Sequence, residues 1–199
     1  MADPPAAVER FLRWWPPVAV AAMLALGIVV GKGSTALDDW FLHNRTGIHG
    51  HRGVLRDFAD ARVMIVLVAV AVLGALWQRR WWLAAVVATF PPATALLVRL
   101  LKPVFGREKD DSLAYPSGHT ALMVVTLGMV LLVLGWRSWA VIAAAVVALL
   151  GILGLAMTYH YFTDTVGSVL LGTAIVCLAV RITGRRPPGP PSRGADRFD

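Results

Sequence analysis

Six long apolar stretches alternate with short polar segments along the chain. A helix that crosses a bilayer needs roughly 20 apolar residues, and each stretch approaches or reaches that length. We therefore predict an all-α integral membrane protein, a bundle of six transmembrane helices. The predicted helices span residues 15–30, 63–77, 81–101, 119–134, 139–158 and 165–180.

Two proline pairs fall within these stretches. Pro16 and Pro17 suit the first turn of the first helix, where a missing backbone N–H loses no helical hydrogen bond. Pro91 and Pro92 lie inside the third stretch. We expect a kink there rather than a break, because packed neighbours can satisfy the freed carbonyl groups.

The distribution of charge and tryptophan orients the bundle. Six helices place both ends of the chain on one side, together with Arg79, Arg80 and Arg137. The positive-inside rule makes that side the cytoplasmic side of a plasma or inner membrane. All tryptophans except Trp40 fall at this predicted inner interface. Many basic residues also lie on the outer side, where an anionic substrate would account for them.

The first stretch also resembles a secretory signal peptide, because arginines precede it and small residues follow Val30. Five further stretches follow, however, and cleavage would leave the two ends of the chain on opposite sides of the membrane. An uncleaved helix is therefore the better interpretation.

Composition agrees with this picture and excludes other classes. Hydrophobic residues make up 57% of the 199 residues and charged ones 16%, against about 25% charged in soluble domains. Residues 1–183 form the predicted membrane domain, and residues 184–199 a disordered basic tail rich in proline and arginine. The net charge of +7 does not indicate nucleic acid, because the bases flank apolar stretches and face lipid headgroups. Cys177 is the only cysteine, which excludes an internal disulfide, and the pattern defines no oligomeric state.

Three polar segments fall at the outer ends of predicted helices. Residues 102–109 follow the third helix, residues 116–119 open the fourth, and residues 160–164 precede the sixth. Because all three lie at the same face of the membrane, no large bend is needed to bring them together. We predict that they form one site for an anionic group.

Two of these segments suit a phosphate. Lys102, Arg107 and Lys109 supply cations, and the arginine can bind two phosphoryl oxygens at once. Ser117 and Gly118 stand at a helix start, where free backbone amides favour an anion. Taken singly, such a lysine is usually a membrane anchor and such a serine an N-cap. Their combination at one face indicates a binding site.

Three further side chains supply chemistry. His160 and Asp164 are four residues apart, which on the first turn of a helix places the carboxylate beside the ring and fixes its tautomer. A histidine held in this way acts as a base or a nucleophile. His119 adds a second imidazole for proton transfer to the leaving group.

The segments resemble the signature of the type 2 phosphatidic acid phosphatase family, membrane lipid phosphate phosphatases related to vanadium-dependent haloperoxidases. That signature has Lys, six residues and Arg-Pro; then Pro-Ser-Gly-His; then Ser-Arg, five residues, His, three residues and Asp. Lys102, residues 116–119, His160 and Asp164 match it. The resemblance implies a helical bundle and metal-independent phosphoryl transfer through a phosphohistidine. It implies these roles: nucleophile His160, its partner Asp164, general acid His119, and phosphate ligands Lys102, Ser117 and Gly118.

Two positions depart from the signature. Lys109-Asp110 stands where the family has Arg-Pro, and Leu153-Gly154 stands where it has Ser-Arg. One phosphate-binding arginine is therefore missing, which weakens transition-state binding unless another cation replaces it. Arg99, just inside the third helix, is either a membrane anchor or a ligand. The candidates to replace the arginine are Arg107 first, then Lys109 and the first-loop residues Arg45, Arg52 and Arg56.

We therefore expect a phosphatase without a cofactor that hydrolyses a lipid phosphate monoester or diphosphate at the outer leaflet, with the bilayer and its lipid as partners. The candidate substrates are polyprenyl diphosphate or phosphate, phosphatidic acid and phosphatidylglycerol phosphate. The alternative is a catalytically weakened relative that binds or transports anionic lipids. A metal site at His43, His49 and His51 is not favoured, because no carboxylate or cysteine stands at a recognisable ligand spacing.

Overall fold

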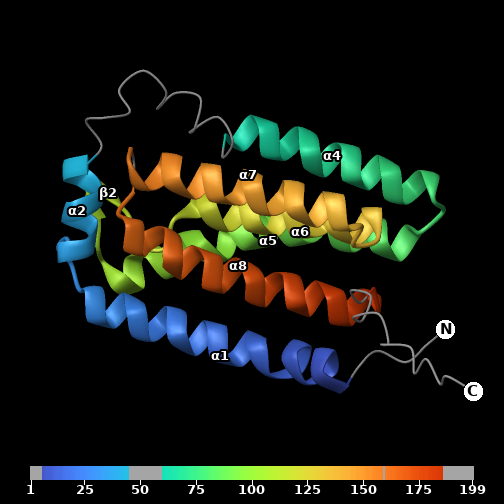
Figure 1. Ribbon diagram of the computed structural model, residues 1–199, viewed down its shortest axis with the longest axis horizontal. Helices are drawn as coiled ribbons and strands as arrows, with labels where there is room; N and C mark the ends of the chain where they lie inside the picture. The colour runs from blue at the N-terminus through green and yellow to red at the C-terminus, as the bar shows by residue number, and fades with distance from the viewer. Residues whose placement is uncertain (1–5, 45–59, 159, 186–199) are drawn as a thin grey trace, which may run out of the picture.

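Six α-helices carry the six apolar stretches of the sequence (Figure 1). They are α1 (Ala6–Val30), α4 (Ala61–Trp77), α5 (Trp81–Phe105), α6 (Gly118–Leu134), α7 (Ser138–Ala156) and α8 (Phe162–Thr183). A short helix, α2 (Ala36–Asn44), follows α1, and a hairpin of strands β1 (Glu108–Lys109) and β2 (Ser112–Leu113) links α5 to α6. The computed structural model describes residues 6–44, 60–158 and 160–185.

Four of the described helices, α1, α5, α7 and α8, are long and apolar enough to cross a membrane. Helices α4 and α6 are also apolar but have 17 residues each. At 1.5 Å per residue they reach roughly 25 Å, slightly less than the ~30 Å hydrocarbon core of a bilayer. The crossing of all six helices therefore remains a prediction.

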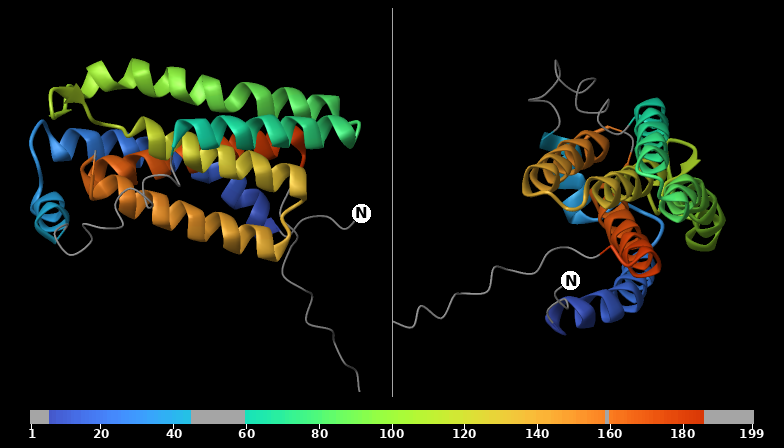
Figure 2. Two further views of the ribbon diagram at one scale, coloured as in Figure 1. Left: turned by 90° about the horizontal axis from the view of Figure 1, so that it is seen from above. Right: turned by 90° about the vertical axis from the view of Figure 1, so that its right-hand side faces the viewer.

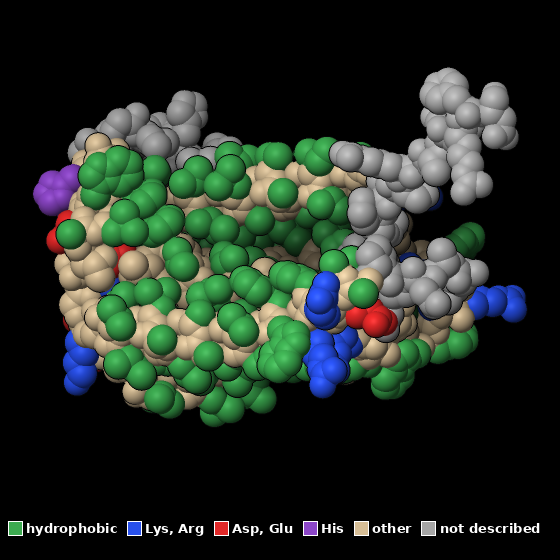
Figure 3. Space-filling model, turned by 60° about the horizontal axis from the view of Figure 1, so that its bottom comes forward, with side chains coloured by type: hydrophobic (Ala, Val, Ile, Leu, Met, Phe, Trp, Pro, Cys, Tyr) green, Lys and Arg blue, Asp and Glu red, His purple; other side chains and the backbone are tan. Residues whose placement is uncertain are grey.

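Large apolar side chains point outward from the bundle. Ile28, Val29, Trp77 and Val104 are between 74% and 91% exposed. Figure 3 shows one face of the molecule, on which hydrophobic side chains predominate and charged ones gather in a few clusters. A continuous apolar surface of this extent is suited to contact with lipid. The chain is a multi-pass membrane protein.

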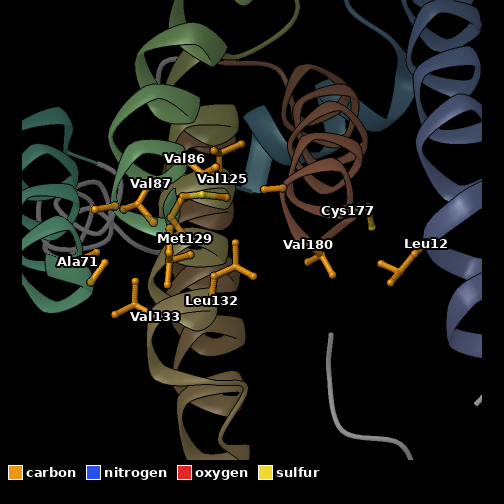
Figure 4. Close-up of a cluster of buried hydrophobic side chains, with 14 residues drawn as sticks. Leu12, Ala71, Val86, Val87, Val125, Met129, Leu132, Val133, Cys177 and Val180 are labelled. Atoms are coloured by element: carbon orange, nitrogen blue, oxygen red, sulfur yellow. The ribbon is translucent and has the colours of Figure 1, made fainter. Parts of the chain in front are cut away.

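Helix α6 lies at the centre of the bundle, packed against α4, α5, α7 and α8, whereas α1 lies along α8 at the edge (Figure 2). The main cluster of buried side chains joins α1, α4, α5, α6 and α8, and includes Val87, Met129 and Val180 (Figure 4). A helix surrounded in this way needs no polar face, which explains why α6 is apolar on all sides.

Glycines allow α6 and α8 to approach closely. A Cβ atom at Gly128 would lie 2.3 Å from Cγ2 of Val176, and one at Gly172 would lie 2.8 Å from Cγ1 of Val124. Small residues serve the same purpose at many interfaces between membrane helices. The close packing thus holds the middle of α8 against the middle of α6.

Gly128→Ala is expected to lower stability by about 1–3 kcal/mol, because its methyl group overlaps Val176. The thermal unfolding midpoint in detergent measures this change. Gly74→Ala is the matched control, since a Cβ atom there would lie an ordinary 3.4 Å from Val133. Adding Val176→Ala to the Gly128→Ala variant should restore the midpoint. An unchanged midpoint in Gly128→Ala alone would contradict the packing.

The structure corrects several predicted boundaries, and the start of the first helix moves furthest. Helix α1 begins at Ala6, not near Trp15, so Pro16 and Pro17 lie well inside the helix rather than in its first turn. The reason is tertiary packing: Leu12 is buried in the main core cluster, which extends the helix beyond its apolar stretch. Helix α5 runs through its internal proline pair as one helix, as expected.

The two ends of the bundle differ. Helix α1 begins and α8 ends at one end, which also carries the turns between α4 and α5 and between α6 and α7 (Figure 1). Arg79, Arg80 and Arg137 belong to these turns. The opposite end carries α2 and the hairpin (Figure 1).

Two aspartates form the turn of the hairpin. Asp110 and Asp111 connect β1 and β2 with φ angles of 50° and 58°. Positive φ at both central positions is typical of a type I′ turn, which aspartate tolerates. The turn returns the chain toward the bundle, and Nζ of Lys109 donates a hydrogen bond of 3.4 Å to the carbonyl of Thr158.

Candidate active site

A cavity of about 630 Å³ opens at the end of the bundle that carries the hairpin. Its walls come from α4, α5, α6, the hairpin and the segment that precedes α8. The residues that line it are Ala61, Ala95, Val98, Arg99, Lys102, Lys109, Asp110, Ser112, Gly118, His119, Leu122 and His160. The cavity thus joins cations and imidazoles to an apolar wall.

Two histidines face each other across this cavity. His119 lies in the first turn of α6 and His160 in the segment before α8, with ring centroids 6.2 Å apart and planes tilted by 55°. The Nδ1 atom of His160 is buried and makes no hydrogen bond within the described part of the chain. It lies 3.9 Å from Oδ2 of Asp164. This side of the ring faces the carboxylate, so Nε2 is the atom available to a substrate.

Asp164 is fully buried in the first turn of α8. Its Oδ2 accepts a hydrogen bond of 3.1 Å from the backbone N–H of Tyr161, and its Oδ1 forms an ion pair of 2.7 Å with Arg107. The carboxylate therefore caps the helix as well as facing His160. This double role fixes its position more firmly than a pairing with histidine alone.

The start of α6 is tied to the start of α8. Ser117 is the N-cap of α6: its Oγ accepts hydrogen bonds from the backbone N–H and the hydroxyl of Thr120. The backbone N–H of Ser117 donates to the carbonyl of Asp164 at 3.3 Å. Ser117 is thus buried, and its hydroxyl oxygen and backbone N–H are already hydrogen-bonded within the protein, whereas Gly118 lines the cavity. Of the two predicted ligands at this helix start, the structure brings only Gly118 to the cavity.

Three cations surround the polar part of the cavity. Lys102 lies in the last turn of α5 and its Nζ donates to the carbonyl of Leu113. Lys109 lies in β1, with its Nζ 5.0 Å from the centroid of the Tyr161 ring. Arg99 lies one helical turn before Lys102 and lines the same cavity. The structure thus places two of the predicted cations together with an arginine whose role the sequence left open.

Arg107, the first candidate for a phosphate ligand, does not line the cavity. Its side chain is fully buried and forms ion pairs of 2.7 Å with both Asp38 and Asp164. Its other hydrogen bonds go to the carbonyl of Gly33 and the hydroxyl of Thr163. Every nitrogen of the guanidinium already donates to a protein group, so the structure does not bring Arg107 to the cations of the cavity.

Asp38 is a residue that the sequence analysis missed. It lies in α2 and is fully buried. Burial alone would raise the pKa of its carboxyl, but hydrogen bonds from Thr163, Thr35 and Arg107 outweigh burial and hold that pKa below its usual value. A signal was present: Thr35-Ala-Leu-Asp38 fits the capping box that opens a helix. The pattern predicts α2 but not the partner of the carboxylate.

The position of the missing arginine contributes no cation. Gly154 is buried in α7, and its carbonyl accepts a hydrogen bond of 2.7 Å from the hydroxyl of Thr158.

His43 lies in α2, where its Nδ1 contacts the carbonyl of Asp39. Within the described residues no group of His, Cys, Asp and Glu is arranged to hold a metal ion. The remaining first-loop candidates, Arg45, Arg52, Arg56, His49 and His51, lie outside the described residues.

Comparisons with known proteins identify the family. A solved structure with a TM-score of 0.72 is "Crystal structure of the first transmembrane PAP2 type phosphatidylglycerolphosphate phosphatase from Bacillus subtilis". At 17% identity the similarity covers 94% of this chain and 100% of that chain, and it establishes the fold. No curated protein sequence matches significantly. The family model of the PAP2 superfamily matches residues 62–188, more than half of the chain, and the protein therefore belongs to this superfamily, the type 2 phosphatidic acid phosphatases.

Proposed function

We propose that this protein is a membrane phosphatase that hydrolyses a lipid phosphate monoester or diphosphate without a metal ion. The observation that carries the proposal is the cavity itself, in which two imidazoles lie 6.2 Å apart beside three cations. One imidazole, His160, is backed by the carboxylate of Asp164. A nucleophile, a proton donor and charges for a phosphoryl group thus meet in one place.

The proposed reaction has two halves. In the first, Nε2 of His160 bonds to the terminal phosphorus, and the P–O bond to the leaving group breaks. That group is the lipid alcohol of a monoester or the lipid phosphate of a diphosphate, and protonated His119 gives its proton to the leaving oxygen. In the second, His119 takes a proton from water, the water oxygen bonds to phosphorus, and the P–N bond breaks. Inorganic phosphate leaves and both rings return to their starting states. Asp164, 3.9 Å from Nδ1, holds the ring and stabilises its positive charge.

The cations bind the phosphoryl oxygens. Lys102 and Lys109 hold the group from two sides, and the backbone amide of Gly118 faces it from the N-terminus of α6. Arg99 supplies the guanidinium that Gly154 lacks. Its position in the cavity wall supports this role, and Arg is better suited than Lys to contact two oxygens together.

The apolar wall supports a lipid as substrate. Ala95, Val98 and Leu122 continue the cavity away from its charged end, along α5 and α6. A headgroup phosphate can lie among the cations while a hydrocarbon chain lies along this wall. The candidates are polyprenyl phosphates and diphosphates, phosphatidic acid and phosphatidylglycerol phosphate, and the structural relative from Bacillus subtilis is named as a phosphatase of the last of these.

We further propose that the cavity faces the outer side of the plasma or inner membrane. Arg79, Arg80 and Arg137 lie at the opposite end of the bundle, together with the start of α1 and the end of α8. The positive-inside rule favours the cytoplasm for that end.

The test is phosphate release by the detergent-solubilised protein from a panel of these lipids. The rate is expected to be unchanged by a chelator, because the cavity carries bases and imidazoles rather than a carboxylate cluster. Vanadate, which adopts the shape of five-coordinate phosphorus, should inhibit. Activity that is lost in chelator and returns with added magnesium would contradict a metal-free reaction.

A second function is favoured by one observation, the glycine at position 154 in place of the family's arginine. A catalytically weakened relative would bind or move anionic lipids without hydrolysing them. The same panel separates the two functions: saturable binding of a lipid phosphate with no phosphate release supports the second.

A further inference from the structure

We propose that Asp38 is a positioning residue for the catalytic pair His160 and Asp164. It holds Arg107 and the first turn of α8, and through them sets where the Asp164 carboxylate faces the nucleophile. This inference rests on the proposed phosphatase function. It assigns a role to α2, a helix that contributes no side chain to the cavity wall among the described residues.

Both oxygens of Asp38 are engaged with groups distant in the sequence. Oδ1 accepts hydrogen bonds from the backbone N–H and the hydroxyl of Thr163, at 2.9 and 3.0 Å. Oδ2 accepts from Nη2 of Arg107 at 2.7 Å. Thr163 immediately precedes Asp164. Asp38 is therefore hydrogen-bonded to the turn of α8 that carries the catalytic carboxylate.

Arg107 links Asp38 to Asp164 by hydrogen bonds to both carboxylates. The planar guanidinium donates from Nη2 to Asp38 and from Nη1 to Oδ1 of Asp164, each at 2.7 Å. With Oδ1 held by the guanidinium, Oδ2 remains directed at Nδ1 of His160. Because a guanidinium is rigid, fixing one of its ends fixes the other.

Helix α2 is itself held firmly. Phe41 stacks on Phe162 with ring centroids 4.3 Å apart and planes 5° from parallel. At its start, the Thr35 hydroxyl donates to Asp38 at 2.8 Å and accepts from the Asp38 backbone N–H at 3.2 Å. Figure 1 shows α2 lying across the end of the bundle, beside the start of α8. Asp38 is therefore preorganised rather than recruited by the substrate.

Charge adds a second effect. Two carboxylates, Asp38 and Asp164, share one guanidinium, so these three buried side chains together carry a net charge of −1. That charge lies on the Nδ1 side of His160 and stabilises the positive ring that forms when phosphorus bonds to Nε2. The other charged or titratable groups that line the cavity with His160 are Arg99 and Lys102 from α5, Lys109 and Asp110 from the hairpin, and His119 from α6.

The experiment compares Asp38→Asn with Asp39→Asn. The second variant removes the same charge from the neighbouring position of α2, where no hydrogen bond to Arg107 or α8 is made. Asp38→Asn is expected to lower kcat about 10- to 100-fold, because the catalytic carboxylate loses its fixed position. KM should stay within about threefold of the wild type, since the cations that bind phosphate are untouched. Asp39→Asn should match the wild type in both.

The pH profile separates positioning from general loss of structure. The acid limb of kcat/KM reports protonation of essential groups in the free enzyme. Asp38→Asn leaves Asp164 as the only carboxylate paired with Arg107, so the network that borders His160 loses its net negative charge and this limb should move to lower pH. A smaller active fraction lowers the rate at every pH equally and leaves the limb in place.

Thr163→Val and Thr163→Ser provide a second test if Asp38→Asn does not fold. Valine removes the hydroxyl that joins Asp38 to Arg107 and keeps every charge, so kcat should fall several-fold with an unmoved acid limb. Serine restores the hydroxyl and should restore kcat.

The outcomes are distinct. A folded Asp38→Asn variant with the kcat and acid limb of the wild type contradicts the inference, as does an equal loss in Asp39→Asn. If Asp38→Asn does not fold, an unchanged kcat in Thr163→Val contradicts it. A wild-type protein that releases no phosphate from any lipid contradicts the proposed function and removes the role of Asp38 with it.

Discussion

His160→Ala is expected to reduce phosphate release to the background rate, because the proposed reaction has no other nucleophile. His160 is the imidazole whose Nδ1 faces a carboxylate, at 3.9 Å from Asp164. Asp164→Asn should leave a residual rate, about 100- to 10,000-fold below the wild type, since the ring remains but its orientation and charge partner are lost. The measurement is the initial rate of phosphate release at saturating lipid.

Two controls sharpen this test. His43→Ala removes an imidazole from α2, outside the cavity wall, and should leave the rate unchanged. His119→Ala should be rescued in part by an aryl phosphate, whose leaving group needs no proton, whereas His160→Ala should not. An alkaline quench, which preserves a P–N bond, should trap labelled phosphate on the wild type. Full activity in His160→Ala, or label retained by that variant, would rule out a phosphohistidine at His160.

Arg99→Gln is expected to lower kcat/KM about 100- to 1,000-fold, the effect of losing one charged ligand of the transition state. Arg99 lies in the cavity wall beside Lys102, and the position of the family's arginine is occupied by Gly154. Arg99→Lys should recover only part of the loss, because an ammonium does not contact two oxygens as a guanidinium does. The rate with the best lipid of the panel measures both variants.

The matched control is Arg62→Gln. Arg62 is an exposed arginine at the same end of the bundle, in the first turn of α4, and it does not line the cavity. It should behave like the wild type. Equal losses in the two variants would indicate a general effect of surface charge on lipid binding, and an unaffected Arg99→Gln would remove Arg99 from the phosphate site.

The contrast between Arg99 and Arg107 shows how a sequence pattern misleads. Arg107 follows Gly106, which ends α5 with a φ of 58°, and the sequence interpretation took this arginine as the first candidate to bind phosphate. The turn directs it instead into the interior, between two carboxylates. Arg99 was ambiguous because an arginine near a helix end is commonly a membrane anchor. The direction of Arg99 depends on how α5 is rotated in the bundle, and that of Arg107 on the turn at Gly106.

The helices, and the meeting of most candidate site residues at one cavity, could be predicted from the amino-acid sequence. An apolar stretch long enough for a bilayer is a local property of the sequence. Lys102, His119 and His160 each stand at the end of such a stretch. Their meeting at one end of the bundle therefore followed from the number of predicted helices. Which cations face the cavity, and which carboxylate holds Arg107, could be read only from the folded chain. Asp38 lies 69 residues from Arg107 and 125 from Thr163. No local pattern encodes a pairing over such separations, because it depends on the packing of α2 against α8, which folding alone brings about.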